Sequence, residues 1–332
     1  MKYIDMHCDT LSIGVAQHKD TITKLDGTMV DIERLIKAGV GAQFFAMFVP
    51  QRNVPEWYGM NEMPEHEVLL DMMCDIFRKT IKENENRMAF AQSYEKMKEN
   101  LQVGKLSAFL TMENAYAVKG KMDNLKKFHD MGVGLMTLTW NDPNCFGQNH
   151  SGNPKLMQIG LTDFGKEAVS YMNDLGIVID VSHLSDAGFY DVAELSKKPF
   201  VASHSNCREL SPATRNLTDE MIRILADKGG VAGINFEPTF LNKNQKDIHS
   251  RVRCMCDHVE HFIKVGGVEC VGIGTDFDGI GGEFEISDCT KMNLFFDELH
   301  RRRISDDTID KIGFGNVERV IKESMKPGNV QF

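Results

Sequence analysis

Residues 176–183 have the sequence Gly-Ile-Val-Ile-Asp-Val-Ser-His and lead directly into Leu-Ser-Asp-Ala-Gly-Phe at residues 184–189. A continuous apolar run of this kind is typical of a strand buried on both faces, which favours a parallel sheet over an antiparallel one. Ser185 and Asp186 then supply side chains that can cap the free N–H groups at the start of a helix. The stretch therefore predicts a buried strand followed at once by a helix.

The same alternation of a short apolar run and a longer amphipathic segment recurs along the chain. Eight runs are predicted strands: 3–9, 40–49, 106–113, 134–140, 177–183, 200–204, 230–236 and 270–276. The predicted helices, with apolar residues at three- and four-residue spacing, are 65–83, 123–131, 163–175, 186–196, 219–228, 250–265 and 291–302. Glycines stand where helices should end, at Gly39, Gly132, Gly176, Gly229 and the pair Gly266-Gly267.

Eight such units predict an α/β fold, a single (β/α)8 TIM-like barrel with a C-terminal helix, and no linker divides residues 1–332 into more than one domain. An open doubly wound sheet is the alternative, although it usually has fewer strands and would need a phosphate loop. The irregular stretches 50–64 and 142–160 both follow predicted strands, so in a barrel they would overhang the active-site face. They are either lid or specificity loops or plain insertions.

The composition excludes several classes of protein. With 38 Lys+Arg against 48 Asp+Glu the formal charge is −10, which argues against a nucleic-acid partner. No stretch approaches the ~18 consecutive apolar residues of a membrane span, and residues 1–9 carry charges where a signal peptide would be apolar, so a cytoplasmic protein is expected. The eight cysteines form no CxxC pair, and reduced thiols are expected.

Five of the predicted strands end in side chains that bind metals. They are His7 and Asp9 after the first strand, Glu113 after the third, His183 after the fifth, His204 after the sixth and Asp276 after the eighth. Residues two apart in a strand face the same side, so His7 and Asp9 can point into the barrel mouth while Cys8 faces the helices.

Each of these residues alone has an ordinary structural explanation, because a lone His often bonds to the backbone and a lone Asp often caps a helix. Together they are the nitrogen and oxygen ligands that zinc takes, in sufficient number for two ions. Other motifs are absent: there is no Gly-Lys-Ser/Thr loop, no HExxH helix and no Gly-x-Ser-x-Gly elbow. His258 and His261 are three apart in a predicted helix, but their charged neighbours favour a solvated face.

At this point the sequence resembles the renal (membrane) dipeptidase family of zinc-dependent dipeptidases. The resemblance runs in order from residue 4 to about residue 279, through Ile-Asp-Met-His-Cys-Asp (4–9), the Glu113 strand, Leu-Thr-Trp-Asn (138–141), Asp-Val-Ser-His (180–183), Ala-Ser-His-Ser (202–205), Arg-Asn-Leu-Thr-Asp (215–219) and Gly-Ile-Gly-Thr-Asp-Phe-Asp-Gly (272–279).

The resemblance implies a barrel with two Zn2+ per subunit that hydrolyses free dipeptides, L,D-dipeptides included, by attack of a metal-bridging hydroxide. By motif position, His7 and Asp9 would hold one zinc, His183 and His204 the other, and Glu113 would bridge them. Asp276 would be the catalytic acid/base, beside Glu113, and Arg215 would bind the substrate. A homodimer is also implied, as is a soluble, bacterial-type member, because the signal and lipid-anchor segments of the animal enzymes have no counterpart here.

One departure affects the substrate. Where many members have a His at the end of the fourth strand, this chain has Trp140, whose indole N–H can donate a hydrogen bond but cannot carry charge. Trp140 is therefore expected to be a substrate-binding pocket residue. The alternative function is a barrel amidohydrolase or deacylase acting on another small amide or ester.

Overall fold

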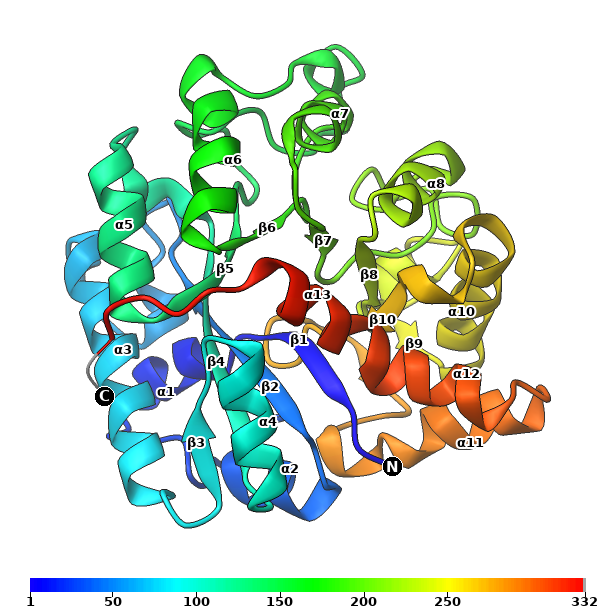
Figure 1. Ribbon diagram of the computed structural model, residues 1–332, viewed down its shortest axis with the longest axis horizontal. Helices are drawn as coiled ribbons and strands as arrows, with labels where there is room; N and C mark the ends of the chain where they lie inside the picture. Colours follow the sequence, from blue (N-terminus) through cyan, green and yellow to red (C-terminus); the bar gives the residue numbers. More distant parts are fainter. Residues whose placement is uncertain (331–332) are drawn as a thin grey trace.

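The computed structural model describes residues 1–330, and its centre is a closed barrel of parallel strands with helices around it (Figure 1). The barrel strands are β1 (Ile4–Cys8), β2 (Ala42–Phe48), β4 (Leu106–Glu113), β5 (Val133–Thr137), β6 (Val178–Asp180), β7 (Val201–Ala202), β8 (Val231–Ile234) and β10 (Val271–Ile273). They pair in the order β2-β1-β10-β8-β7-β6-β5-β4, and a further pairing between β2 and β4 closes the ring. The predicted (β/α)8 barrel is confirmed.

Three short strands were not predicted. β3 (Met88–Phe90) pairs with the first half of β4, and β9 (His249–Ser250) pairs with β11 (Glu283–Phe284) in a separate two-stranded sheet. Segments of two or three residues are too short to show a period in the sequence. All eight predicted runs, in contrast, overlap barrel strands.

The helices cover the outside of the barrel. Their bounds are α1 (Thr10–Ala16), α2 (Ile32–Ala38), α3 (His66–Glu83), α4 (Tyr94–Gln102), α5 (Met122–Met131), α6 (Asp163–Leu175), α7 (Asp186–Leu195), α8 (Asp219–Asp227), α9 (Pro238–Leu241), α10 (Val252–Gly266), α11 (Asn293–Arg301), α12 (Asp306–Asp310) and α13 (Asn316–Ser324). α1, α2, α4, α9 and α12 were not among the predicted segments. Within residues 1–330, no helix combines the length and the apolar character that a bilayer crossing requires.

Side-chain caps fix where several helices begin. The side chain of Ser185 accepts a hydrogen bond from the backbone of Gly188 at the start of α7, and Thr162 and Thr218 cap α6 and α8 in the same way. Gly39 ends α2 in the left-handed conformation, with φ of 72°. Ser185, which the sequence offered as a cap, therefore marks the start of α7.

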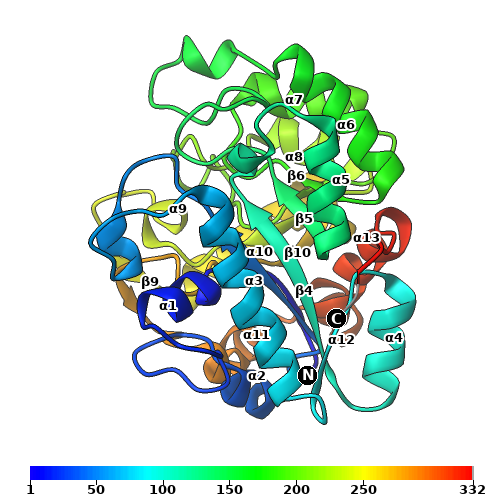
Figure 2. The ribbon, with the colours of Figure 1, turned by 90° about the vertical axis from the view of Figure 1, so that its left-hand side faces the viewer.

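One end of the barrel is closed by the C-terminal helix. α13, red in Figure 1, packs its apolar side chains Val317, Val320 and Ile321 into a cluster with buried residues from the barrel strands, among them Ile4, Phe44 and Phe109. In Figure 2, α1 and α9 lie on the left of the molecule and α13 on the right. The apolar cluster beneath α13 and the loops that follow the strands are thus at opposite ends of the barrel.

Candidate metal centre and active site

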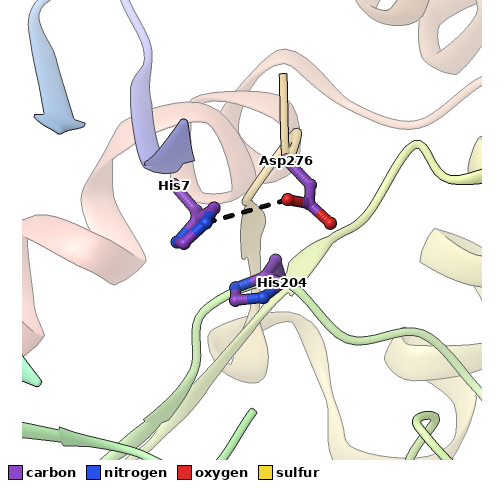
Figure 3. Close-up of side chains that lie close together, drawn as sticks. All are labelled: His7, His204 and Asp276. Atoms are coloured by element: carbon purple, nitrogen blue, oxygen red, sulfur yellow. Dashed lines mark ion pairs between the residues drawn. The ribbon is translucent and has the colours of Figure 1, made fainter. Parts of the chain in front are cut away.

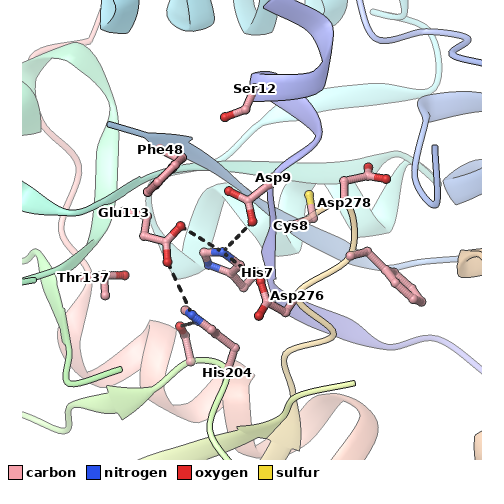
Figure 4. Close-up of polar contacts among 12 residues, drawn as sticks. His7, Cys8, Asp9, Ser12, Phe48, Glu113, Thr137, His204, Asp276 and Asp278 are labelled. Atoms are coloured by element: carbon pink, nitrogen blue, oxygen red, sulfur yellow. Dashed lines mark hydrogen bonds and ion pairs between the residues drawn. The ribbon is translucent and has the colours of Figure 1, made fainter. Parts of the chain in front are cut away.

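Six ionisable side chains meet at the carboxyl ends of five barrel strands. All six residues are buried, with at most 9% of the whole residue's surface exposed. Figure 4 shows all of them except His183 grouped around His7. The structure brings together all six residues that the strand ends predicted: His7, Asp9, Glu113, His183, His204 and Asp276.

A bulge in β1 aims His7 and Asp9 into the barrel mouth. Between the pairs Asp5–Gln43 and Cys8–Phe45, β1 advances three residues while β2 advances two. The extra residue reverses the side-chain alternation. Met6 therefore packs in the cluster beneath α13, while Cys8 packs in the outer core, as expected.

The imidazole of His7 is surrounded by carboxylates. Its Nε2 lies 3.3 Å from Asp9 Oδ2, 3.6 Å from Glu113 Oε2 and 3.7 Å from Asp276 Oδ1. Figure 3 shows the contact between His7 and Asp276 with His204 next to it, and the rings of His7 and His204 stack with centroids 3.9 Å apart.

Glu113 connects this carboxylate group to a second group made of imidazoles. Its Oε1 lies 3.1 Å from His183 Nε2 and 3.5 Å from His204 Nε2, while its Oε2 faces His7. The Nε2 atoms of His183 and His204 are 3.2 Å apart. A carboxylate with one oxygen toward each group is placed to bridge two cations.

The two groups differ in their protonation. Burial opposes charge on His7, but the carboxylates of Glu113 and Asp9 outweigh it and hold its pKa well above the usual value. Burial lowers the pKa of His183 and of His204 well below the usual value, and nearby positive charges, including Arg215 and His7, lower it further. Burial raises the pKa of the Asp276 carboxyl. His183 and His204 are thus neutral at neutral pH, the form in which an imidazole can bind a metal.

These side chains fit metal ions. Three sets of donors each lie within 4.8 Å of one another: His7, Asp9 and Glu113; Glu113, His183 and His204; and His7, His204 and Asp276. Asp9 Oδ1 is buried and has no hydrogen-bond partner among residues 1–330. A buried carboxylate oxygen without a partner is costly unless a cation takes it.

Hydrogen bonds at Nδ1 orient the imidazole of His204. Its Nδ1 lies 2.7 Å from Ser203 Oγ, and the Ser203 hydroxyl donates to Asp180 Oδ2 at 2.6 Å. Asp180 also accepts from the Thr137 hydroxyl and from two backbone N–H groups. With its proton on Nδ1, His204 turns the lone pair of Nε2 toward Glu113 and His183.

Arg215 lies beside this cluster and has spare hydrogen-bond donors. Its Nη1 donates to Ser205 Oγ at 2.6 Å, but its buried Nε and Nη2 have no partner within the described residues. Its guanidinium stands 5.7 Å from the ring of Phe240, which lines the cavity above. Burial lowers the pKa of Arg215 to about 10, so the group remains charged at neutral pH.

A cavity of about 550 Å³ opens over the cluster. Three aromatic rings form one wall: Phe48 and Trp140 have centroids 4.8 Å apart, and Trp57 and Trp140 5.8 Å apart. Trp140 therefore lines the cavity, and its ring centroid lies 6.3 Å from that of His183. Trp57 and His150 come from the irregular stretches 50–64 and 142–160, which do border the cavity.

The lining residues to which the sequence assigned no role include Asn141, His150, Glu237 and Asp278. Asp278 is two residues from Asp276 and accepts from Thr10 Oγ1 and the Met29 backbone, each at 2.6 Å; burial raises its pKa to about 6. His150 lies in a loop without periodicity, and no local pattern marked it. Burial lowers the pKa of His150 to about 4, with Arg215 and Arg208 adding to the effect.

The expectation for His258 was wrong. His258 is fully buried: its Nδ1 accepts the Cys207 N–H at 3.1 Å, and its Nε2 lies 3.1 Å from the Leu241 carbonyl oxygen. His261 pairs with Asp219 at 2.6 Å. His258 thus bonds α10 to the segments after β7 and β8, and the charged neighbours in the sequence face the other side of the helix.

A closed (β/α)8 barrel with buried His, Asp and Glu donors at the carboxyl ends of its strands is the arrangement of a barrel metallohydrolase. The sequence model of the membrane dipeptidase family, peptidase family M19, matches residues 1–329. The chain belongs to this family of metallo-dipeptidases, which confirms the resemblance seen in the motifs.

Relatives and solved structures agree. An uncharacterized dipeptidase of Schizosaccharomyces pombe is 30% identical over 303 residues, covering 89% of this chain and 72% of that protein. A crystal structure of the dipeptidase AC, a metallo peptidase of family M19, matches with a TM-score of 0.87 at 26% identity over 98% of each chain. A metallo peptidase from Rhodobacter sphaeroides, liganded with a phosphinate mimic of L-Ala-D-Ala, has the same fold, with a TM-score of 0.88 at 24% identity over 98% of this chain and 99% of that one.

Proposed function

We propose that the chain is a binuclear zinc dipeptidase that hydrolyses free dipeptides, including those with a D-residue at the C-terminal position. The observation that carries the proposal is Arg215, whose two unpartnered N–H-bearing nitrogens are buried beside the cluster of metal donors. A metal cluster alone fits many hydrolases, whereas a buried guanidinium with unused donors calls for a substrate that carries an anion.

The ligands divide between two zinc ions. His7 and Asp9 would hold one ion, His183 and His204 the other, and Glu113 would bridge them through its two oxygens. Imidazole nitrogen and carboxylate oxygen are ordinary zinc ligands. When bound, two zinc ions lower the pKa of water toward neutrality and polarise a carbonyl.

Asp276 is placed to move the protons of the reaction. Its Oδ2 accepts a hydrogen bond from Asn235 Nδ2 at 2.8 Å, which leaves Oδ1 toward His7 and the cavity. Because burial raises its pKa, Asp276 can take the proton of the attacking water and deliver it to the leaving amine near neutral pH. A side chain at Gly279 would collide with both Asp9 and Asp276, so this approach requires glycine.

Arg215 would bind the terminal carboxylate of the substrate. A carboxylate that reaches it past Phe240 would accept from Nη2 and Nε and would satisfy both unpartnered donors. The cavity of about 550 Å³ has room for a dipeptide but is far smaller than a protein-binding groove. The L-Ala-D-Ala mimic bound by the Rhodobacter sphaeroides relative supports L,D-dipeptides as substrates.

The test is a substrate panel given to the zinc-loaded protein, with products identified by mass spectrometry. The panel holds L,L- and L,D-dipeptides, the corresponding dipeptide amides, N-acetylated dipeptides and phosphate esters. We expect cleavage of the free dipeptides and much slower cleavage of the amides, because an amide offers Arg215 no negative charge. Cleavage of esters or N-acetyl compounds alone would replace the proposal with an amidohydrolase or deacylase function on the same fold.

A further inference from the structure

Asn141 lies between two imidazoles in the cavity wall. Its Oδ1 is 3.3 Å from Nδ1 of His183 and 2.8 Å from Nε2 of His150. An amide oxygen has two lone pairs and can accept from both rings at once. Asn141 therefore joins a proposed metal ligand to a histidine that the mechanism above does not use.

The hydrogen atoms can be assigned along this chain of contacts. His183 Nε2 faces Glu113 and His204, so it must keep its lone pair to bind a metal, and the proton of the neutral ring must be on Nδ1. That N–H needs an acceptor, which Asn141 Oδ1 supplies. Asn141 must then be held with its oxygen, and not its NH2 group, toward His183.

His150 is the group that holds Asn141 in this orientation. Its Nε2–H donates to Asn141 Oδ1, and its Nδ1, 3.4 Å from Thr214 Oγ1, accepts the hydroxyl proton. Every donor in this set thus has an acceptor: Thr214 donates to His150, and both His150 and His183 donate to Asn141 Oδ1. A flipped Asn141 would place its NH2 group against two N–H donors, which is unfavourable.

The backbone of His183 is fixed by the same loop. The His183 carbonyl accepts from the His150 backbone N–H at 2.7 Å and from Thr139 Oγ1 at 3.0 Å. His183 has φ of 69°, a left-handed conformation that is uncommon for a residue other than glycine. These two bonds hold the backbone of the ligand, while Asn141 holds its ring.

We infer that Asn141 and His150 are positioning residues that set the tautomer and orientation of His183 for its metal ion, with His150 acting through Asn141. This inference rests on the proposed two-ion centre but not on the identity of the substrate. The Nδ1 atom of His204 contacts Ser203, which is bonded to the charged carboxylate of Asp180. The Nδ1 atom of His183 instead contacts the neutral amide of Asn141, which His150 holds in place.

The test measures the two successive zinc affinities by competition with a chelator and records absorption spectra of the cobalt-substituted protein. Asn141→Leu removes the acceptor. We expect the affinity for one of the two zinc ions to fall by ~10–100-fold, the usual effect of losing the hydrogen-bond partner of a metal-binding histidine. Asn141→Asp keeps an acceptor and should retain both ions. His150→Phe should weaken the same ion less than Asn141→Leu does. Gln158→Ala, an exposed change in the same loop, is the matched control.

The double variant Asn141→Leu/His150→Phe separates a relay from two independent effects. Because His150 acts through Asn141, the double variant should lose no more affinity than Asn141→Leu alone. The inference is overturned if the losses add, if both ions weaken equally, or if folded Asn141→Leu binds both ions as wild type does. Should Asn141→Leu fail to fold, His150→Phe is compared with His150→Gln, which keeps an N–H donor: His150→Phe alone should weaken the binding of one ion, and equal binding by both variants would overturn the inference. The affinity pattern with no dipeptide cleavage would leave this inference standing and overturn the proposed function.

Discussion

The β1 side of the centre, with His7, Asp9 and Asp276, concentrates negative charge, whereas the β6–β7 side offers the neutral imidazoles of His183 and His204. On the first side, carboxylates hold a proton on His7 that a metal must displace. On the second side, no proton has to leave, but a hydrogen bond at Nδ1 must orient each ring so that its Nε2 lone pair faces the metal site. The comparison indicates that two ions of the same element would be bound for different physical reasons: one by charge, the other by orientation.

The largest expected effect comes from the residue that the two sides share. Glu113→Gln replaces the carboxylate between His7 and His183 with an amide, so the affinity for both metal ions should fall. Two bound ions would stabilise the transition state by several kcal/mol, and each 1.36 kcal/mol is tenfold in rate, so we expect turnover to fall on the order of 10⁴-fold. Metal analysis with steady-state kinetics checks this; loss of only one ion would show that Glu113 belongs to one side.

The next effect separates chemistry from metal binding on the β1 side. Asp276→Asn keeps the size of the side chain and the bond from Asn235 but cannot accept a proton. We expect kcat to fall about 10²–10⁴-fold, the range for losing a general acid or base, with both ions still bound. Normal turnover in this variant would remove Asp276 from the mechanism, and loss of an ion would make it a ligand.

A smaller effect is expected on substrate binding. Arg215→Met removes the buried charge and the unpartnered donors. A charge-assisted hydrogen bond contributes about 1.5–3 kcal/mol, so KM for a dipeptide should rise about 10–100-fold. Hydrolysis of a dipeptide amide should change little, which makes the amide the internal control. Equal losses on both substrates would mean that Arg215 does not bind the carboxylate.

The smallest effect is the pH dependence of the two affinities. The pKa of His7 is raised, so an ion on the β1 side competes with a proton, and its affinity should increase by up to about tenfold per pH unit below that pKa. The pKa values of His183 and His204 are lowered, so affinity on their side should stay flat near neutral pH. Calorimetry in buffers of different ionisation enthalpy should detect about one proton released for one ion and almost none for the other. Equal release would contradict the difference between the sides.

The meeting of the six His, Asp and Glu side chains could be predicted because the fold turns a sequence pattern into a spatial one. Parallel strands all end at the same end of the barrel, so a His, Asp or Glu directly after an apolar run falls in the mouth. His183 and His204 are 21 residues apart in the chain, yet their Nε2 atoms are 3.2 Å apart. No contact between them had to be known, because their positions at strand ends were sufficient.

The rest depended on irregular backbone. The bulge in β1 rests on one extra residue that leaves no mark in the sequence, although it lets Met6 and Cys8, two residues apart, face different surroundings. His150 reaches His183 from a loop whose course is set by tertiary contacts. His258 was misassigned because charged neighbours on a helix describe one face and not the other.

The central claim, that the two sides hold two ions that act as a unit, is tested most directly by adding zinc to the metal-free protein while bound ions and L,D-dipeptide turnover are measured together. We predict two ions per chain, with little turnover until the second ion binds. Full turnover with one ion per chain, or no dipeptide hydrolysis with two ions bound, would contradict the account.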